Sequence, residues 1–309
     1  MLLMLVFYFC LAGASNIITI NNQPIEPKNP KSPQYVMSEI KGQLTYQTFT
    51  SFKNLSGLEI SRCAISDLDP STFRVTPLEI LDIHNNVEFP TITSDTFRFL
   101  KNLEVFRFNF NPYTSIEEGS FIQLKQLKVL TISHQQIQKL TKEFLDGLDN
   151  LQELSMTNND IKSVDKNAFA HMKELTAIYL NHNSLKMLEI GTFRYQLKLE
   201  DLQLQSNYLG NTQNSYFINW DKFDRIISLR YLNIAHNDLR HLNVQKLIKA
   251  FPSIKSINFT PNNFTCSNEL YITKSLRHYR IDIEYYGNTI SSCRGLDFDV
   301  IGNKVFMEH

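Results

Sequence analysis

The chain has 309 residues, with 31 basic and 31 acidic side chains and a hydrophobic fraction of 42%. This fraction is large enough to build a core, so a wholly disordered chain is excluded. The formal net charge of zero provides no basic excess for neutralising phosphates, which argues against nucleic acid as the ligand.

Residues 1–14 have the pattern of a secretory signal peptide. An apolar run from Leu2 to Leu11 is followed by the small residues Ala-Gly-Ala at positions 12–14. The run is too short to span a bilayer, and we expect cleavage after Ala14. No later stretch of about 18 or more apolar residues follows, so the sequence predicts a secreted, extracellular protein without a membrane span.

Three Asn-x-Ser/Thr triplets fit this route and predict a glycoprotein. They begin at Asn54, Asn258 and Asn263. Pro261 directly follows the second triplet and makes it a poor acceptor.

Residues 15–35 carry prolines at positions 24, 27, 30 and 33. Proline-rich segments favour extended backbone, so we expect an arm in front of the next region.

From residue 36 to residue 265 one pattern recurs about every 24 residues. Each block reads L-x-x-L-x-L-x-x-N, and a degenerate earlier turn is expected within 35–52. The first apolar residues of the blocks are Leu55, Leu78, Leu103, Leu127, Leu151, Leu175, Leu199, Leu229 and Ile254. A fixed period of this length indicates a solenoid, because no single unit buries its own apolar face.

The pattern assigns a role to each repeated position. The first, fourth and sixth residues are apolar, so alternate side chains of a short strand point inward. The Asn that ends each block is expected to hydrogen-bond to backbone groups left unpaired by a bend. These residues are Asn86, Asn111, Asn159, Asn183, Asn207, Asn237 and Asn262. Recurring phenylalanines predict a stacked spine on the convex side, with room there only for a turn or a short 3₁₀ segment: Phe73, Phe97, Phe121, Phe144, Phe169, Phe193 and Phe223.

These blocks resemble the leucine-rich repeat family, in particular its extracellular type with repeats of about 24 residues. The resemblance covers about residues 55–265. It implies an α/β-type solenoid, curved into an arc with a parallel concave β-sheet, with about nine repeats and a C-terminal disulfide cap. The phenylalanine-containing repeats are similar to those of arthropod secreted immune proteins and Toll-like receptor ectodomains. The resemblance implies a non-catalytic protein that binds another macromolecule and needs no cofactor.

Residues 266–309 are similar to the cysteine-bearing C-terminal cap and tail of extracellular leucine-rich repeat proteins. The resemblance implies a disulfide between Cys266 and Cys293, with a zinc site as the alternative. A helical pattern begins after Cys266. Cys63 occupies the Asn position of the first full repeat, where we expect a small buried group; a reactive or intermolecular thiol is the alternative.

The sequence contains no enzyme motif of the G-x-S-x-G, H-E-x-x-H or Walker type, so no enzymatic activity is expected. His134, His182 and His236 share one repeat position. Residues two repeats apart on a sheet are separated by roughly 10 Å, too far to share a metal ion. Solvated histidines or pH-sensitive binding contacts are the remaining interpretations.

The concave face is the first candidate binding surface. One of its outward positions is Phe110. A phenylalanine that faces solvent needs a binding partner, or cover from Arg107 and neighbouring side chains. The candidate residues are Arg62, Asp82, Arg107, Phe110, His134, Tyr179, His182 and His236.

A second candidate lies in the longest repeat, which begins at Leu199. Its insert at 210–220 contains Tyr216, Phe217 and the only tryptophan, Trp220. Aromatic residues on solenoid loops often take part in recognition. The alternative is that Phe217 and Trp220 complete the convex core.

The sequence predicts a role in innate immune recognition or as an extracellular scaffold. The predicted ligand is a protein or a microbial surface. A homo- or hetero-oligomer is compatible with this prediction. The alternative is an extracellular matrix or developmental adhesion modulator of the small leucine-rich proteoglycan type. The absence of an acidic Ser-Gly attachment region counts against this alternative.

Overall fold

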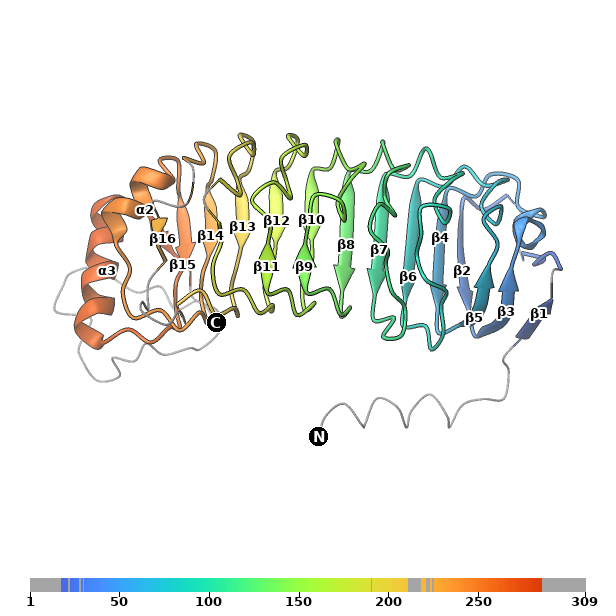
Figure 1. Ribbon diagram of the computed structural model, residues 1–309, viewed down its shortest axis with the longest axis horizontal. Helices are drawn as coiled ribbons and strands as arrows, with labels where there is room; N and C mark the ends of the chain where they lie inside the picture. The colour runs from blue at the N-terminus through green and yellow to red at the C-terminus, as the bar shows by residue number, and fades with distance from the viewer. Residues whose placement is uncertain are drawn as a thin grey trace.

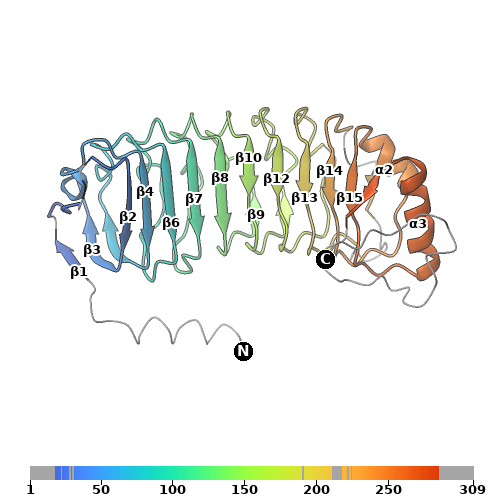
Figure 2. The same ribbon diagram turned by 180° about the vertical axis from the view of Figure 1, so that it is seen from behind.

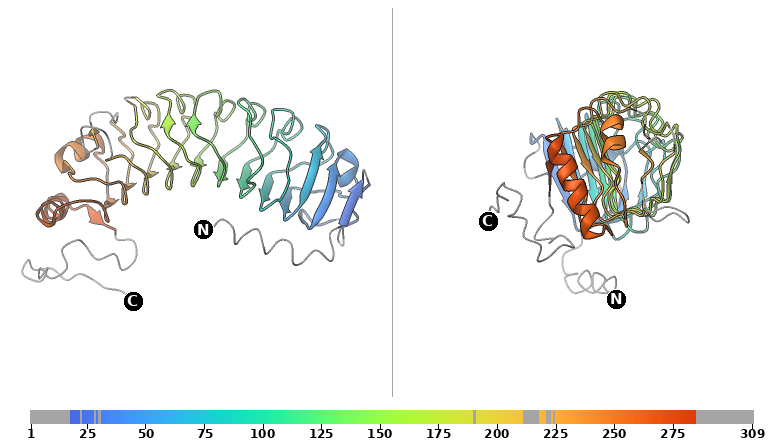
Figure 3. Two further views of the ribbon diagram at one scale, coloured as in Figure 1. Left: turned by 60° about the horizontal axis from the view of Figure 1, so that its bottom comes forward. Right: turned by 90° about the vertical axis from the view of Figure 1, so that its left-hand side faces the viewer.

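The computed structural model describes residues 18–21, 23–27, 29, 31–189, 191–210, 218–220, 223 and 225–284. These residues form a curved solenoid with a parallel sheet on the inside of the arc and turns on the outside (Figures 1 and 3). The predicted signal peptide at 1–14, Tyr216, Phe217 and Cys293 lie outside the described residues.

The concave sheet contains eleven strands that run parallel along the whole arc (Figure 2). In order they are β2 (Gln34–Ser38), β4 (Gly57–Ser61), β6 (Ile80–His84), β7 (Val105–Asn109), β8 (Val129–Ser133), β10 (Glu153–Ser155), β12 (Ala177–Tyr179), β13 (Asp201–Gln203), β14 (Tyr231–Asn233), β15 (Ser256–Asn258) and β16 (Asp282–Ile283). Nine of them come from the nine predicted blocks. Strand β2 belongs to the degenerate earlier turn, and β16 extends the sheet at its C-terminal edge. The predicted curved leucine-rich repeat arc is confirmed.

Two smaller parallel sheets line the return side. One contains β1 (Ile18–Asn21), β3 (Ile40–Leu44) and β5 (Ala64–Leu68), and the other contains β9 (Lys139–Leu140) and β11 (Ser163–Val164). Strand β1 lies within the proline-containing segment and pairs with β3. Gly42 makes this approach possible, because its φ is 131° and a Cβ there would collide with the Ile20 carbonyl oxygen.

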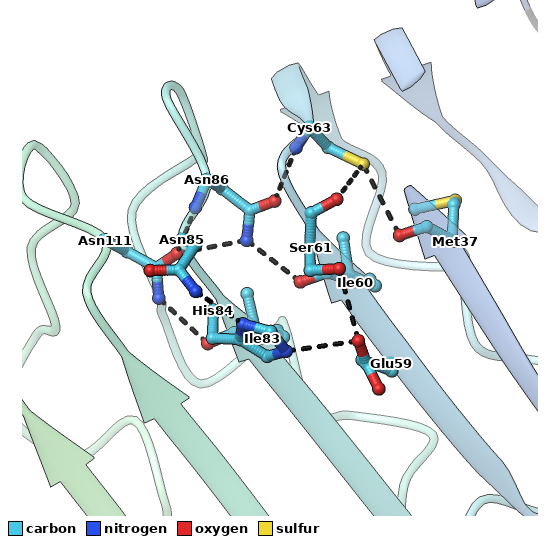
Figure 4. A network of polar contacts seen from close by, with 10 residues as sticks. All are labelled: Met37, Glu59, Ile60, Ser61, Cys63, Ile83, His84, Asn85, Asn86 and Asn111. Atoms are coloured by element: carbon cyan, nitrogen blue, oxygen red, sulfur yellow. Dashed lines mark hydrogen bonds and ion pairs between the residues drawn. The ribbon is translucent and has the colours of Figure 1, made fainter. Parts of the chain in front are cut away.

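Buried asparagines connect neighbouring repeats, as predicted. Asn86 donates through Nδ2 to the Ile60 carbonyl at 3.0 Å, and its Oδ1 accepts from the Cys63 amide at 2.9 Å (Figure 4). Asn159 likewise donates to the Ile132 carbonyl at 2.7 Å. The bonds satisfy backbone groups that the strands leave at their ends, so each repeat fixes the previous one.

The predicted phenylalanine spine is also present. Phe97 and Phe121 have ring centroids 5.9 Å apart, and Phe169, Phe193 and Phe223 follow one another at 5.8 and 5.9 Å. All of these side chains are buried. Stacking between successive turns gives the convex side its own continuous core.

Cys63 is buried and free, as expected for a small group at the Asn position. Its Sγ lies 3.3 Å from the Ser61 carbonyl and 3.6 Å from the Met37 carbonyl (Figure 4). Burial raises the pKa of this thiol, which keeps it in its unreactive protonated form.

In the described part of the chain, helical segments interrupt the turns at η1 (Tyr46–Phe49), α2 (Val244–Ala250) and α3 (Cys266–His278). The expectation of only a turn or a short 3₁₀ segment on the return side is wrong at α2, an α-helix that Asn243 caps by accepting from the Lys246 amide. The predicted helix after Cys266 is confirmed as α3, which begins at the Thr265 N-cap.

Helix α3 lies at the C-terminal end of the solenoid (Figure 3). It buries Ile272 and Leu276, and this covers apolar surface that the last repeat would otherwise expose. Cys266, at its first turn, is disulfide-bonded. None of the helices in the described parts of the chain is long and apolar enough to cross a membrane.

Candidate binding surface

Two structural features position the side chains of the concave face. Within each strand, alternate residues point away from the core because strand geometry has a period of two. After the strand, one residue adopts left-handed backbone geometry, with φ between 53° and 58°. It follows directly after β2, β4, β6, β7 and β8, and three residues after the end of β10, β12, β13 and β14. This second row contains Glu39, Arg62, Asn85, Phe110, His134, Asn158, His182, Ser206 and His236. The sequence pattern gave His134, His182 and His236 one repeat position but gave no signal for the left-handed conformation of this row.

Phe110 and His134 form an aromatic pair in the second row. Their ring centroids are 3.7 Å apart and the rings are tilted by 20°. Phe110 is still 47% exposed, so the cover that it needs comes only in part from His134. Burial and the nearby His182 lower the pKa of His134, so at neutral pH the pair presents an uncharged, flat surface.

The N-terminal part of the sheet carries a mixed set of charges. His84 Nε2 lies 3.2 Å from Glu59 Oε1, and Arg62 Nε lies 3.7 Å from Glu39 Oε1 at the exposed rim. Asp82 is half-buried, and its Oδ1 has no hydrogen-bond partner. Burial raises the pKa of the Asp82 carboxyl, although His84 and Arg107 act in the opposite direction.

In the C-terminal part, Tyr179 lies against Asp201 on the neighbouring strand. The Tyr179 hydroxyl donates to Asp201 Oδ2 at 3.4 Å, and Gln203 Nε2 donates to Asp201 Oδ1 at 2.5 Å. Burial, followed by the charges of Asp201 and Glu153, raises the pKa of Tyr179 to about 12. Tyr179 therefore stays a hydrogen-bond donor at every physiological pH. Sequence reasoning identified Tyr179 but missed Asp201, although the acidic Glu153 at the same strand position two repeats earlier was a signal that could have found it.

The predicted concave residues share one face, but they do not converge on a single point. His182 and His236 are exposed and separated along the arc, as the repeat spacing implied. Among the residues described, no group of three or more His, Cys, Asp or Glu side chains is placed to hold a metal ion. The arrangement is that of an extended contact surface.

Trp220 does not belong to this surface. It is 2% exposed, with its ring 5.4 Å from Phe223 and 5.7 Å from Phe251. The candidate assignment of Trp220 to a binding loop is therefore corrected: its side chain completes the convex core of the longest repeat. Its indole ring fills the space that the additional residues of this repeat create.

The three predicted glycosylation sites differ in accessibility. Asn54 and Asn263 are exposed. Asn258 is 2% exposed, and its Nδ2, the atom that a glycan would join, is buried. Glycosylation therefore remains a proposal for Asn54 and Asn263, while the fold leaves no space for a glycan at Asn258.

A model of the leucine-rich repeat matches residues 76–137, 125–185 and 173–239. The chain belongs to the leucine-rich repeat family. Its concave face is therefore the inner surface of a leucine-rich repeat arc, a fold that typically serves as a scaffold for protein interactions. No curated protein sequence matches the chain.

Solved structures share this fold at low identity. A chain of the Drosophila Toll–Spatzle complex matches with 16% identity and a TM-score of 0.65, covering 87% of this chain and 39% of that one. A chain of the glycosylated form of that complex matches with 20% identity and a TM-score of 0.62, covering 79% and 36%. An internalin from Listeria monocytogenes matches with 17% identity and a TM-score of 0.56, covering 82% and 74%. The chain thus spans well under half of the Toll–Spatzle chains that it matches.

Proposed function

We propose that this leucine-rich repeat protein is a non-catalytic extracellular binding protein whose concave sheet holds a second protein. One observation carries the proposal: eleven parallel strands present a continuous outward surface on which the Phe110–His134 pair is exposed. An exposed aromatic residue in the middle of a polar surface is typical of an anchor in a protein interface.

The sequence and the disulfide bond of Cys266 support the proposed extracellular location. Residues 1–14 have the pattern of a signal peptide, and Asn54 and Asn263 are exposed acceptors for glycans. Cys266 is disulfide-bonded, which is typical of proteins in oxidising compartments. We propose that its partner is Cys293.

We further propose that the protein acts in innate immune recognition or as an extracellular scaffold. Support comes from the similar fold in the Toll–Spatzle complex, which is described as a hub in Drosophila development and innate immunity. A developmental adhesion modulator is the second candidate, because the same description names development. In both roles the ligand is a protein or a microbial surface, and the chain acts alone or in an oligomer.

A capture experiment with matched variants tests the proposal. The tagged mature chain is incubated with extracellular fluid of the source organism, with and without bacteria, and the co-eluting proteins are identified under non-reducing conditions. Phe110→Ser is the test variant. Tyr271→Ser is the control, because Tyr271 is an exposed aromatic residue on α3, away from the concave sheet.

We expect Phe110→Ser to reduce the captured partner at least about tenfold, as for an interface anchor, and Tyr271→Ser to leave capture unchanged. Defence proteins among the captured partners support the immune role, whereas receptor or matrix proteins support the adhesion role. Equal capture by Phe110→Ser and the unmodified chain would contradict the concave surface as the binding site.

A further inference from the structure

We propose that the C-terminal half of the concave sheet binds a cationic protein segment, one that presents Arg or Lys side chains from an extended chain. This inference rests on the proposed function, because it uses the same concave surface and names the chemistry of its partner.

The outward strand positions of the concave sheet are strongly acidic. They carry the carboxylates Glu59, Asp82, Glu153, Asp201 and Asp282, whereas Arg107 is the one Lys or Arg side chain among the described positions. The whole chain has a formal net charge of zero, so this face concentrates negative charge that other faces balance. A concave surface of one sign attracts partners of the opposite sign.

The excess lies chiefly between β10 and β16. We call Glu153, Asp201, Asp282 and Glu284 the acidic strip. Strands β10, β12, β13, β14, β15 and β16 place no Lys or Arg at a described outward position, and Arg107 lies two strands away from Glu153, on β7. Among the described residues, no ion pair joins a carboxylate of the acidic strip to a Lys or Arg side chain, and Arg230, which precedes β14, pairs with Glu200.

Asp201 is the central carboxylate of the strip. Its hydrogen bonds come from the neutral groups of Tyr179 and Gln203. Burial raises the pKa of the Asp201 carboxyl, and the charge of Glu284 adds to this effect. A half-buried carboxylate held only by neutral donors gains more from an incoming guanidinium or ammonium group than an exposed one does.

The residues between the carboxylates suit a cationic side chain. Ala177 stands between Glu153 and Asp201 in the register of the sheet, and its small, buried side chain carries no charge. Strands about 4.8 Å apart place the two carboxylate-bearing positions roughly 10 Å apart, which a guanidinium group can bridge. Tyr231, next to Asp201 on β14, is 43% exposed and offers a ring face for a cation–π contact.

A separate observation is that this half of the face contains buried polar atoms without a partner. Asn258 follows Tyr179 and Gln203 in the same outward row, is 2% exposed, and its Nδ2 has no hydrogen-bond partner. Thr260 Oγ1 and Gln205 Oε1 are also buried without a partner. Unpaired buried donors and acceptors are costly, so stability alone does not account for these polar residues.

The experiment measures binding of a labelled nona-arginine peptide to the full mature chain by fluorescence anisotropy, with nona-glutamate as the peptide of opposite charge. The test variant is Glu153→Gln/Asp201→Asn. The matched control, Asp95→Asn/Glu143→Gln, removes the same two charges from exposed positions on the return side. Circular dichroism melting verifies that both variants fold.

We expect nona-arginine to bind the unmodified chain and the control, and the test variant to bind at least about tenfold more weakly. We also expect binding to weaken as salt rises from about 0.05 to 0.5 M, and nona-glutamate not to bind. Equal loss in both variants would overturn the proposal, because it would show a response to net charge alone. Absence of nona-arginine binding would also overturn it. If Phe110→Ser still reduces capture of a natural partner, the proposed function stands without this inference.

Discussion

At the scale of single residues, the asparagines and the carboxylates have opposite effects on the fold. Buried asparagines that end a repeat block, such as Asn86 and Asn159, pair with backbone groups of the neighbouring repeat, whereas Asp82 has a buried oxygen without a partner. An unpaired buried polar atom costs stability. The concave face therefore contains groups whose presence the fold alone does not explain.

Removal of one buried asparagine tests whether these side chains stabilise the contact between neighbouring repeats. Asn159→Ala loses the bond to the Ile132 carbonyl and the bond from the Gln135 amide. We expect it to lower the free energy of unfolding by about 1–3 kcal/mol, measured by urea denaturation. Asn150→Ala, which removes one exposed bond to the Lys125 carbonyl, is the control and should change it by less than about 0.5 kcal/mol. Equal effects would show that the buried asparagines do not stabilise the repeats.

The carboxylate of Asp82 gives a prediction about pH. The pKa of Asp82 is raised in the folded state, so ionisation of this carboxyl lowers the free energy of unfolding at pH values above its unfolded pKa. This destabilisation disappears as the pH falls through the folded pKa, because the carboxyl then becomes protonated. Asp82→Asn should therefore raise Tm by about 1–3 °C at pH 7 and leave it unchanged near pH 3. A rise in Tm of the same size at both pH values would mean that ionisation is not the cause.

At the scale of elements, the sequence predicts what recurs and misses what occurs once. The period of about 24 residues places the nine concave strands of the predicted blocks, the asparagines and the phenylalanine spine, because the same physical demand repeats in each turn. Strand β1 and helix α2 depend on single local features, Gly42 and the Asn243 cap. Trp220 was ambiguous because an aromatic residue in an insert suits a core and a binding loop equally well. Asp201 was missed although Glu153 and Asp282 occupy the same strand position in other turns.

Gly42 provides a test of the pairing between β1 and β3. Gly42→Ala places a methyl group against the Ile20 carbonyl, at a φ that residues with a side chain rarely adopt. We expect faster hydrogen–deuterium exchange at the amides of residues 40–44 and a lower Tm. Gly119→Ala also has a positive φ, but no atom lies within 4 Å of its Cβ position, so it serves as the control. Exchange in β3 that is no faster in Gly42→Ala than in the control would contradict the close approach.

At the scale of the whole molecule, the arc separates stability from recognition. The inward side chains, the asparagines and the phenylalanine spine hold adjacent repeats together, whereas the outward side chains of the concave sheet are free to vary. The whole chain has a formal net charge of zero, but the outward strand positions of the concave face carry more carboxylates than Lys and Arg side chains. Long parallel sheets of this kind present a partner with a broad surface in place of a pocket.

The central claim is that this surface, and not the convex side, contacts the partner. Site-specific photo-crosslinking tests it directly, with benzoylphenylalanine introduced at Thr131 on the concave sheet or at Lys142 on the return side. Both chains are irradiated with the partner captured from extracellular fluid, and the products are resolved by mass. The account predicts a crosslinked product from position 131 and none from position 142. A product from position 142 alone would contradict it.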